Sequence, residues 1–373
     1  MGYIPLLAVL GFGEQILGEV EVGPDYKEVI AFIESIKQKL KPGQTYSFVC
    51  GYEAGCLGYV LYHQLTKAGV KCVILAPNTM HVEQGPRIKT DRRDAKLIAQ
   101  CLCYGGYHPV HVSTAKDESV KEYLRMRDDH QGAWKKIKQQ INAFLLRHGH
   151  VYTGTKWTMR HIAWLNKLES ELDQMYGEIL KEYLTSYEEL ESKIERFNAR
   201  IEELAQDDCY KAQVSKLGCF IGIKTHTALS MIVETGDFNR FPNANSYAAF
   251  LGLPPGEHSS STSVHRLSIT KAGNSHCRTL LVESSGGICK GTVCHKSKAL
   301  RARQASQKPD VIAYADKANT RLRSKYYRMM RHGKKRNVAV TAVARELACF
   351  IWGMMTGNIG LTRQTQASAK AGR

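Results

Sequence analysis

A long apolar repeat occupies the middle of this chain and restricts how the chain can fold. Apolar residues recur there in steps of three and four over about 40 residues, with charged residues between them. This spacing forms a heptad seam, which predicts a coiled coil or a long helical hairpin whose stripe serves packing and self-association rather than chemistry. The residues of the seam are Leu165, Leu168, Leu172, Met175, Ile179, Tyr183, Tyr187, Leu190, Ile194, Phe197, Ile201 and Leu204.

The N-terminal part of the chain, up to about residue 115, alternates between strand and helix patterns. Two apolar stretches flank a glycine-containing turn at 11–13 and predict a β-hairpin. Short strands then alternate with helices of the 3.6-residue period, which indicates a mixed α/β layer. The predicted strands are 6–10, 15–22, 46–50 and 71–76, and the predicted helices are 26–40, 56–68 and a helix that begins at Asp91.

The charge of the chain points to a polyanionic partner. With 52 Lys and Arg against 35 Asp and Glu, it carries a formal net charge of +17 and has a pI near 9.3. Each phosphate that such a protein neutralises releases condensed counterions, and this release drives binding to nucleic acid. Residues 290–336 contain fifteen Lys or Arg and only two acids, Asp310 and Asp316. A solvated helix face intersperses both signs, so this segment predicts a C-terminal nucleic-acid surface.

The eleven cysteines form neither a metal-binding nor a disulfide pattern. Their number is odd, no C-x-x-C pair occurs, and Cys101 and Cys103 are the only close pair, which is typical of reduced thiols in an intracellular protein. No run approaches the roughly 18 to 20 apolar residues of a membrane span. The apolar residues 4–10 lack the basic segment and the cleavage site of a secretory signal. We therefore expect a cytoplasmic protein without a membrane partner.

Residues 252–278 combine hydroxyl groups with cations and histidines. After a Pro-Pro pair, five serines lie between residues 255 and 270, namely Ser259, Ser260, Ser261, Ser263 and Ser268. A serine hydroxyl becomes a nucleophile when one group removes its proton and another neutralises the charge that develops on the group attacked. The alternative is a solvated turn, because Ser and Thr bond their own backbone and favour loops. The nearby cations and bases are Arg266, Lys271, Arg278, His258, His265 and His276.

Three acids stand at the ends of predicted elements in the N-terminal part. Glu53 follows a strand, while Asp91 and Asp94 are three residues apart and so project from one face at the start of a helix. Mg²⁺ takes oxygen ligands and is commonly held by a few carboxylates together with phosphate oxygens. The three acids are therefore candidate Mg²⁺ ligands. The alternative for Asp91 and Asp94 is ordinary helix capping, with one acid at the N-cap and one at N3.

Four motifs between residues 217 and 286 occur in a fixed order. They are G-D-F-N-R-F at 236–241, A-A-F-L-G-L-P-P-G-E-H-S-S at 248–260, I-T-K-A-G-N-S-H-C-R at 269–278 and L-L-V-E at 280–283. This segment resembles the C-terminal transposase domain of the insertion sequence 110 family, whose members are serine recombinases guided by a bridge RNA. A glycine usually follows the serine pair of that family, and Ser261 stands there in this chain. By that alignment the nucleophile is Ser260, with Ser259 as the alternative.

A second resemblance covers residues 46 to 112. Y-E-A-G at 52–55 and K-T-D-R-R-D-A at 89–95 are similar to the RuvC-like, ribonuclease-H-type domain of the same transposases. That domain uses four acids in the order Asp, Glu, Asp, Asp, and Glu53, Asp91 and Asp94 match the last three. The first belongs on the opening strand, but this chain has no Asp before Asp25. The nearest acid, Glu14, lies in the predicted turn and is not assigned as a ligand.

These features predict a chain of three structured parts and a tail. Residues 1–115 form an α/β RuvC-like catalytic domain whose first strand is truncated or divergent, and residues 116–210 form a helical, coiled-coil linker. Residues 211–360 form a mainly α transposase domain with the serine motif and basic helices. Residues 361–373 form a disordered polar tail.

The predicted function is that of a DNA transposase or recombinase. The resemblance implies that Ser260 attacks a DNA phosphodiester to form a phosphoserine link, while Glu53, Asp91 and Asp94 hold Mg²⁺ near the same phosphate. It also implies a structured guide RNA and, together with the seam, a homo-oligomer formed through the coiled coil. Two alternatives are a metal-dependent RuvC-like nuclease with a structural serine and a nucleic-acid-binding remnant whose catalysis has decayed. The residues expected to meet nucleic acid are Arg266, Lys271, Arg278, Arg321, Arg323, Lys325 and Arg328.

Overall fold

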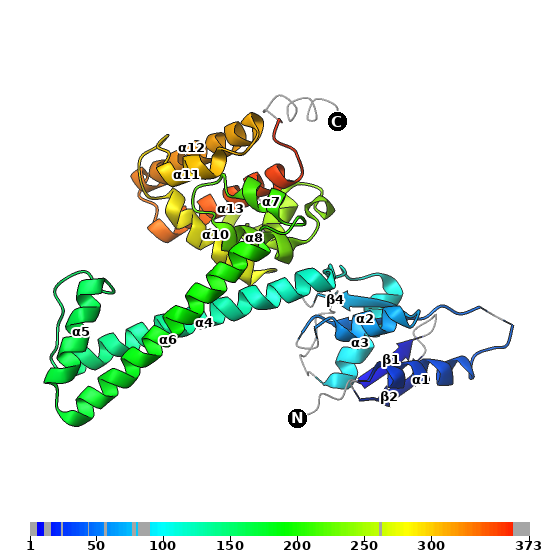
Figure 1. The fold of residues 1–373 in the computed structure, drawn as a ribbon. Helices are drawn as coiled ribbons and strands as arrows, with labels where there is room; N and C mark the ends of the chain where they lie inside the picture. Colours follow the sequence, from blue (N-terminus) through cyan, green and yellow to red (C-terminus); the bar gives the residue numbers. More distant parts are fainter. Residues whose placement is uncertain are drawn as a thin grey trace. The chain divides into compact units, whose positions relative to one another are not determined.

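The computed structural model describes residues 6–10, 16–23, 25–43, 45–55, 58–76, 80, 90–260 and 263–360, of which 6–10, 258–260 and 263–266 are described by their backbone alone. The predicted disordered tail therefore lies outside the described residues. The chain divides into two compact units, Met1–Val112 and Ser113–Arg373. Helices predominate in the described part and the sheets are small, as Figure 1 shows.

In its described residues, the first unit combines two small sheets with three helices. β1 (Leu6–Leu10) and β2 (Ile16–Glu21) pair antiparallel, so the predicted hairpin is confirmed. β3 (Val49–Glu53) and β4 (Lys71–Leu75) run parallel and are connected through α2 (Val60–Lys67). α1 (Tyr26–Lys37) follows the hairpin, and α3 (Asp91–Tyr104) follows β4. This order is the mixed α/β organisation that the sequence predicts.

The helices of the first unit pack closely on its strands. A Cβ on Gly18 of β2 would lie 2.7 Å from Cδ1 of Ile36, so a side chain there would push the Ile36 side chain of α1 aside. A Cβ on Gly51 of β3 would lie 2.8 Å from Leu75 and 2.9 Å from Leu102, which brings α3 equally close to β3. The face of β3 that carries Gly51 therefore looks toward α3. The buried core between α1, α2 and the strands consists of Val22, Val29, Ile33, Leu65 and Cys72.

Two long helices begin the second unit. α4 (Ala115–Arg147) and α6 (Gln174–Leu204) lie side by side and run antiparallel (Figure 1). The rings of Phe144 and Tyr176 meet at one end, and Arg127 donates a hydrogen bond to Asn198 at 3.0 Å nearer the other. The predicted seam is only partly used in this packing, since its members Tyr187, Ile194 and Ile201 are buried while Met175 and Ile179 are exposed. In the first half of α6 the buried stripe is shifted by one residue, to Leu180 and Leu184.

The seam does not form one continuous helix. α5 (Met159–Glu171) stops before Leu172, whose extended backbone (ψ 159°) lets the chain turn before α6 begins. A Cβ on Gly177 of α6 would lie 2.8 Å from the carbonyl oxygen of Glu169, so α5 and α6 approach backbone to backbone there. Periodicity alone does not reveal this break, because the steps of three and four continue through it.

In the described residues after α6, helices accompany one β-hairpin. Side-chain oxygens of Asn243 and Asn274 cap two of these helices by accepting the backbone N–H three residues further on. Pro309 begins another helix, at a position where a backbone N–H has no acceptor within the helix, so the missing N–H of Pro costs no hydrogen bond. The elements are α7 (Lys211–Leu217), α8 (Thr225–Thr235), the 3-10 helix η2 (Phe238–Arg240), α9 (Ala244–Phe250), β5 (Pro255–Ser260), β6 (Ser263–Ile269), α10 (Ser275–Ile288), α11 (Lys298–Gln304), α12 (Pro309–Arg331) and α13 (Arg336–Met355).

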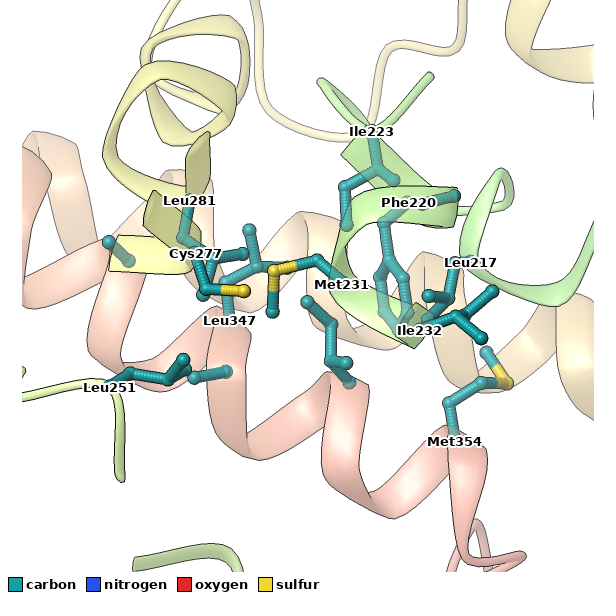
Figure 2. Close-up of a cluster of buried hydrophobic side chains, with 14 of the residues drawn as sticks. Leu217, Phe220, Ile223, Met231, Ile232, Leu251, Cys277, Leu281, Leu347 and Met354 are labelled. Atoms are coloured by element: carbon teal, nitrogen blue, oxygen red, sulfur yellow. The ribbon is translucent and has the colours of Figure 1, made fainter. Parts of the chain in front are cut away.

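α13 lies at the centre of the core of this helical part. Figure 2 shows Leu347 of α13 beside Met231 of α8 and Cys277 of α10. By length and composition alone, α13 is apolar enough to cross a membrane, which corrects the expectation that no segment has this property. Its apolar side chains are used in the core instead. Those that are fully buried are Ala339, Val343, Ala344, Leu347, Ala348 and Ile351.

Candidate active site and nucleic-acid surface

The serine motif forms the turn end of the β5–β6 hairpin. The two strands pair antiparallel, with Ser259 opposite Val264 and Ser260 opposite Ser263. Ser260 is therefore the last residue of β5, directly before the turn. Ser261 and the side chains of the turn lie outside the described residues. The backbone is that of paired strands, which differs from the irregular solvated turn that was the alternative.

Two tightly packed glycines support the base of this hairpin. Gly252 (φ +64°) precedes β5 and Gly273 (φ +86°) follows β6, and both lie in the left-handed region that favours glycine. A Cβ on Gly252 would lie 2.1 Å from the carbonyl oxygen of Ala272, and one on Gly273 would lie 2.1 Å from that of Phe250. A hydrogen bond from the backbone N–H of Asn274 to the same Phe250 oxygen (2.9 Å) closes the base. The hairpin therefore has a rigid support.

Several predicted partners of the serine lie at this base rather than at the turn. At about 3.3 Å per residue, β5 separates Ser260 from the base by about 17 Å. Lys271 follows β6 and is exposed, while His276 and Arg278 belong to the first turns of α10. Arg278 donates a hydrogen bond to the carbonyl oxygen of Leu251 (3.0 Å), so it supports the hairpin base. The predicted partners that share the strands with Ser260 are His258, His265 and Arg266.

The predicted metal-binding acids lie around α3. Glu53 ends β3, and strand alternation puts it on the same face as Gly51, which looks toward α3. Asp91 and Asp94 occupy the first turn of α3. The N-cap is Thr90, whose hydroxyl accepts the N–H of Arg93 (3.4 Å), so the proposed capping role of Asp91 is wrong. Among the described residues, no three His, Cys, Asp or Glu side chains are arranged to hold a metal ion.

One acid near α3 was missed in the sequence. Glu19 of β2 forms an ion pair with Arg92 (2.7 Å), which stands between Asp91 and Asp94. Glu19 also pairs with Ala8 of β1. β1 is the strand that the resemblance predicts to carry the first acid. The signal was available, since Glu19 lies within the predicted hairpin, but only the strand register shows that it adjoins β1. Glu14, which the sequence did not support as a ligand, lies outside the described residues.

Two of the predicted nucleic-acid cations on α12 are engaged with α13. Arg321 and Lys325 both form ion pairs with Glu346, and Lys325 also bonds the carbonyl oxygen of Ala342 (3.2 Å). Burial raises the pKa of Glu346, but the two cations lower it by more, so the pKa lies below its usual value. These cations hold α12 and α13 together, which leaves them less available to phosphates.

Arg323 does not fit its predicted role. Only 5% of its surface is exposed, and its guanidinium donates hydrogen bonds to the carbonyl oxygens of Ile288 (2.8 Å), Thr292 and His295 (3.3 Å). The five fixed donors of a guanidinium suit such a cluster of carbonyls. Arg323 therefore supports the segment after α10 and is not part of the nucleic-acid surface.

The exposed charge gathers where α12 passes into α13. Five basic residues between 328 and 336 are exposed, with no acid among them. In the part of the chain that the structure describes, none of the five forms an ion pair, unlike Arg321 and Lys325. We call this segment the basic turn. Its residues are Arg328, Arg331, Lys334, Lys335 and Arg336.

Comparison with known proteins identifies the family of this chain. A sequence model described as the Transposase IS116/IS110/IS902 family matches residues 216–293, which include the serine hairpin, and a second model, described as Transposase, matches residues 11–149. Over 304 residues the chain is 36% identical to "Putative transposase y4qE" of Sinorhizobium fredii, covering 81% of this chain and 74% of that protein. The chain belongs to the IS116/IS110/IS902 family of transposases.

Further relatives extend the match along this transposase. It is 28% identical over 338 residues to the "Transposase for insertion sequence element IS1533" of Leptospira borgpetersenii, covering 86% of this chain and 92% of that protein. It is 25% identical over 335 residues to the "Transposase for insertion sequence element IS1111A" of Coxiella burnetii, covering 86% and 82%. The family resemblance predicted from the sequence is confirmed. The N-terminal match is to a DEDD-type transposase domain, which suggests that a divalent metal ion is used.

The transposase also holds a buried acid beside the hairpin base that sequence reasoning missed. Glu234 in the last turn of α8 accepts hydrogen bonds from Arg125 of α4 (2.8 Å) and from the side chain of Asn274 (2.8 Å). The three residues are widely separated in the sequence and share no motif. Only the packing of α4, α8 and α10 brings them together.

A second acid, Asp128 of α4, lies next to Glu234 and Arg125. The carboxylate of Asp128 faces Nε2 of His226 on α8 (3.1 Å) and Nε2 of His276 on α10 (3.7 Å). Burial raises the pKa of Asp128, but His226 and Arg127 lower it by more, so the pKa lies below its usual value. Beside these groups opens a cavity of about 550 Å³, lined by Glu122, Arg125, Asp128, Asp129 and residues 273–276.

Proposed function

We propose that this transposase cuts and rejoins DNA through Ser260. The Ser260 oxygen attacks the phosphorus of a DNA phosphodiester and gives up its proton to a base. The new oxygen–phosphorus bond replaces the bond from phosphorus to one deoxyribose oxygen, which leaves with a proton. Attack on this phosphoserine by the hydroxyl of another strand releases Ser260 and rejoins the DNA.

The observation that carries this proposal is the position of Ser260 at the turn end of a hairpin with a rigid base. Nucleophilic attack gains most of its rate when the reacting atoms are held in a fixed geometry. Charge on the attacked phosphate needs a cation, and Arg266 and Lys271 are the candidates. Arg278 is less suited, because its guanidinium bonds the Leu251 oxygen.

Trapping of a covalent protein–DNA adduct tests this proposal. Ser260→Ala is expected to abolish the adduct while DNA binding stays within about twofold, because the hydroxyl forms a bond but adds little affinity. Ser259→Ala is the matched control and is expected to keep the adduct. Loss of the adduct in Ser259→Ala but not in Ser260→Ala would show that Ser259 is the nucleophile. An adduct that survives both changes would end the serine proposal.

Mg²⁺ is the proposed metal ion of the first unit. Glu53, Asp91 and Asp94 supply the carboxylate oxygens that Mg²⁺ prefers. In the described residues, however, these acids do not gather around one point, and β1 carries no acid. The residues as arranged do not form a complete site, so we derive no step through a metal ion. We expect adduct formation in this chain to be slow for the same reason.

DNA and a structured guide RNA are the proposed partners, with the basic turn as their shared surface. Among the described residues, its five exposed cations form no ion pair, unlike Arg321 and Lys325, which pair with Glu346. Sequencing the nucleic acid that copurifies with the protein tests the RNA partner. A single structured RNA species supports a guide, whereas random cellular RNA contradicts it.

Self-association through the α4–α6 pair is also part of the proposal. Large apolar side chains are exposed where α4 ends and α6 begins, and the rings of His148 and Tyr176, whose centroids lie 4.4 Å apart, show that these ends touch. Exposed apolar groups gathered at one end of a helix pair suit contact with a second copy. Sedimentation of the full chain tests this. The exposed residues at this end are Leu146 (62%), Val151 (66%) and Met175 (66%).

The alternatives give different outcomes in the same assays. A metal-dependent nuclease with a structural serine would cut DNA without any adduct and would keep cutting in Ser260→Ala. A remnant without catalysis would bind nucleic acid but would neither cut DNA nor form an adduct. The missing first acid is the observation that favours the remnant.

A further inference from the structure

A buried carboxylate joins three helices at the base of the serine hairpin. Glu234 has 5% of its side chain exposed and accepts hydrogen bonds from Nε and Nη2 of Arg125 (3.1 and 2.8 Å) and from Nδ2 of Asn274 (2.8 Å). Burial raises the pKa of Glu234, but Arg125 and Asn274 lower it by more, so the carboxylate is charged at neutral pH. Because a buried charge that loses a partner is strongly destabilising, these donors are held firmly in place.

Asn274 uses both ends of its side chain. Its Oδ1 accepts the backbone N–H of Cys277 (2.9 Å) and caps α10, while its Nδ2 donates to Glu234. Its own backbone N–H donates to Phe250 just before the hairpin begins. Asn274 therefore connects the base of β5 and β6, the start of α10 and the buried acid of α8.

A second set of charged contacts joins α4, α8 and α10, one helical turn after Arg125 on α4. Asp128 faces His226 of α8 and His276 of α10, and Arg127 donates to Asp128 at 3.0 Å. The hairpin base is thus connected to α8 and α4 by charged groups, while its glycines pack on Ala272 and Phe250 within the base itself. No part of this arrangement is needed to cap α10, which the Asn274 oxygen does alone.

We propose that Glu234 is a positioning residue that, through Asn274, locks the base of the serine hairpin onto α8 and α4 and so fixes where Ser260 stands when it attacks DNA. The proposal rests on the proposed function of Ser260. Its structural part, that the bond between Glu234 and Asn274 holds the hairpin base, stands independently of catalysis.

Asn274→Asp removes this bond and little else. An Asp side chain still caps α10, but its second oxygen then faces the Glu234 carboxylate instead of donating to it. Asn243→Asp is the matched control, because Asn243 caps α9 in the same way and is exposed. In the double variant Asn274→Asp with Glu234→Gln, the new amide donates to the new carboxylate, which restores the bond with its polarity reversed.

Amide hydrogen exchange on the full-length chain decides the structural part. We expect protection at the hairpin base and the first turn of α10 to fall about tenfold in Asn274→Asp, to stay at the wild-type level in Asn243→Asp, and to recover in the double variant. A general loss of structure would instead lower protection throughout the helical part. Wild-type protection of the hairpin base in Asn274→Asp would overturn the proposal.

The rate of adduct formation decides the functional part. At saturating DNA we expect this rate to fall about tenfold or more in Asn274→Asp and to recover in the double variant, while the dissociation constant for DNA stays within about twofold. If the wild-type adduct depends on Ser260 and the rate is unchanged in Asn274→Asp, the positioning role of Glu234 is refuted and the proposed function of Ser260 is not. A wild type without any adduct that depends on Ser260 would refute the proposed function, and the exchange result would still decide the structural claim.

Discussion

Arg323 and Arg328 lie five residues apart on α12, yet one belongs to the core and the other to the surface. We expect Arg323→Ala to lower the free energy of unfolding by about 2–4 kcal/mol, because it leaves three carbonyl oxygens without donors in a buried site. Arg328→Ala is expected to change it by less than about 0.5 kcal/mol while weakening nucleic-acid binding. Urea unfolding of both variants checks this. Equal stability of the two variants would contradict the assignment of Arg323.

Single residues also mark the limit of sequence reasoning. Glu53, Asp91, Asp94 and Ser260 could be chosen because each stands in a recognisable motif. The role of Arg323 could not, since a basic run gives no sign of which side chain turns inward. Glu19 and Glu234 were missed for a related reason. Their partners are distant in sequence, and only strand register or helix packing brings them together.

At the scale of elements, α4, α8 and α10 meet through groups whose charge depends on pH. Burial lowers the pKa of His276, Glu234 and Asp128 raise it, and Arg125 and His226 lower it again, with a net decrease. The unfolded chain then takes up a proton on His276 at a higher pH than the folded protein does. The contribution of His276 to the free energy of unfolding is therefore fully present above the pKa of about 6.5 that His276 has in the unfolded chain. It decreases as the pH falls toward the lower pKa of the folded protein.

Replacing His276 with Asn tests this dependence. Between pH 7 and pH 5.5 we expect the wild type to lose up to about 1 kcal/mol of unfolding free energy through His276. The variant should lose correspondingly less over the same range. His332→Asn, at an exposed position on the surface, serves as the control and should follow the wild type. Parallel pH profiles for wild type and His276→Asn would show that His276 does not titrate as described.

Elements differ in how far the sequence defines them. The β1–β2 hairpin, the order of strands and helices in the first unit and the helix α4 follow from periodicity and turn residues. The third strand was placed too early, since β3 runs over Val49–Glu53 rather than over 46–50. The end of α5 near Leu172 does not, because the apolar steps continue through it and only the packing of α5 on α6 requires a break. The serine segment is rich in loop-forming residues, so its strand pairing also depends on tertiary support from Gly252 and Gly273.

At the scale of the whole molecule, the net charge of +17 predicts binding that depends steeply on salt. Replacing all five residues of the basic turn with Gln is expected to reduce the log–log salt slope on duplex DNA by about 4 to 5, because each phosphate that the protein neutralises adds about 0.9 to the slope. Titrations at several salt concentrations measure the slope. The control replaces five exposed cations of α5 and α6, namely Arg160, Lys167, Lys181, Arg196 and Arg200.

The two sets of replacements remove the same formal charge. The control set should therefore lower affinity slightly through the overall field and leave the slope nearly unchanged, since the effect of distant charges is screened within about 10 Å at 0.1 M salt. If both sets reduced the slope equally, nucleic acid would bind the protein over a much wider surface than the basic turn.

The central claim is that Ser260 is bonded covalently to a DNA phosphate during strand exchange. Mass spectrometry of the trapped adduct, after digestion of both protein and DNA, tests it most directly. We predict a nucleotide joined through its phosphate to Ser260 in the peptide that spans the β5–β6 turn, accumulating slowly because Glu53, Asp91 and Asp94 do not form a complete metal site in the described residues. DNA cut without any modified serine, or a nucleotide joined to a residue outside this hairpin, would contradict the account.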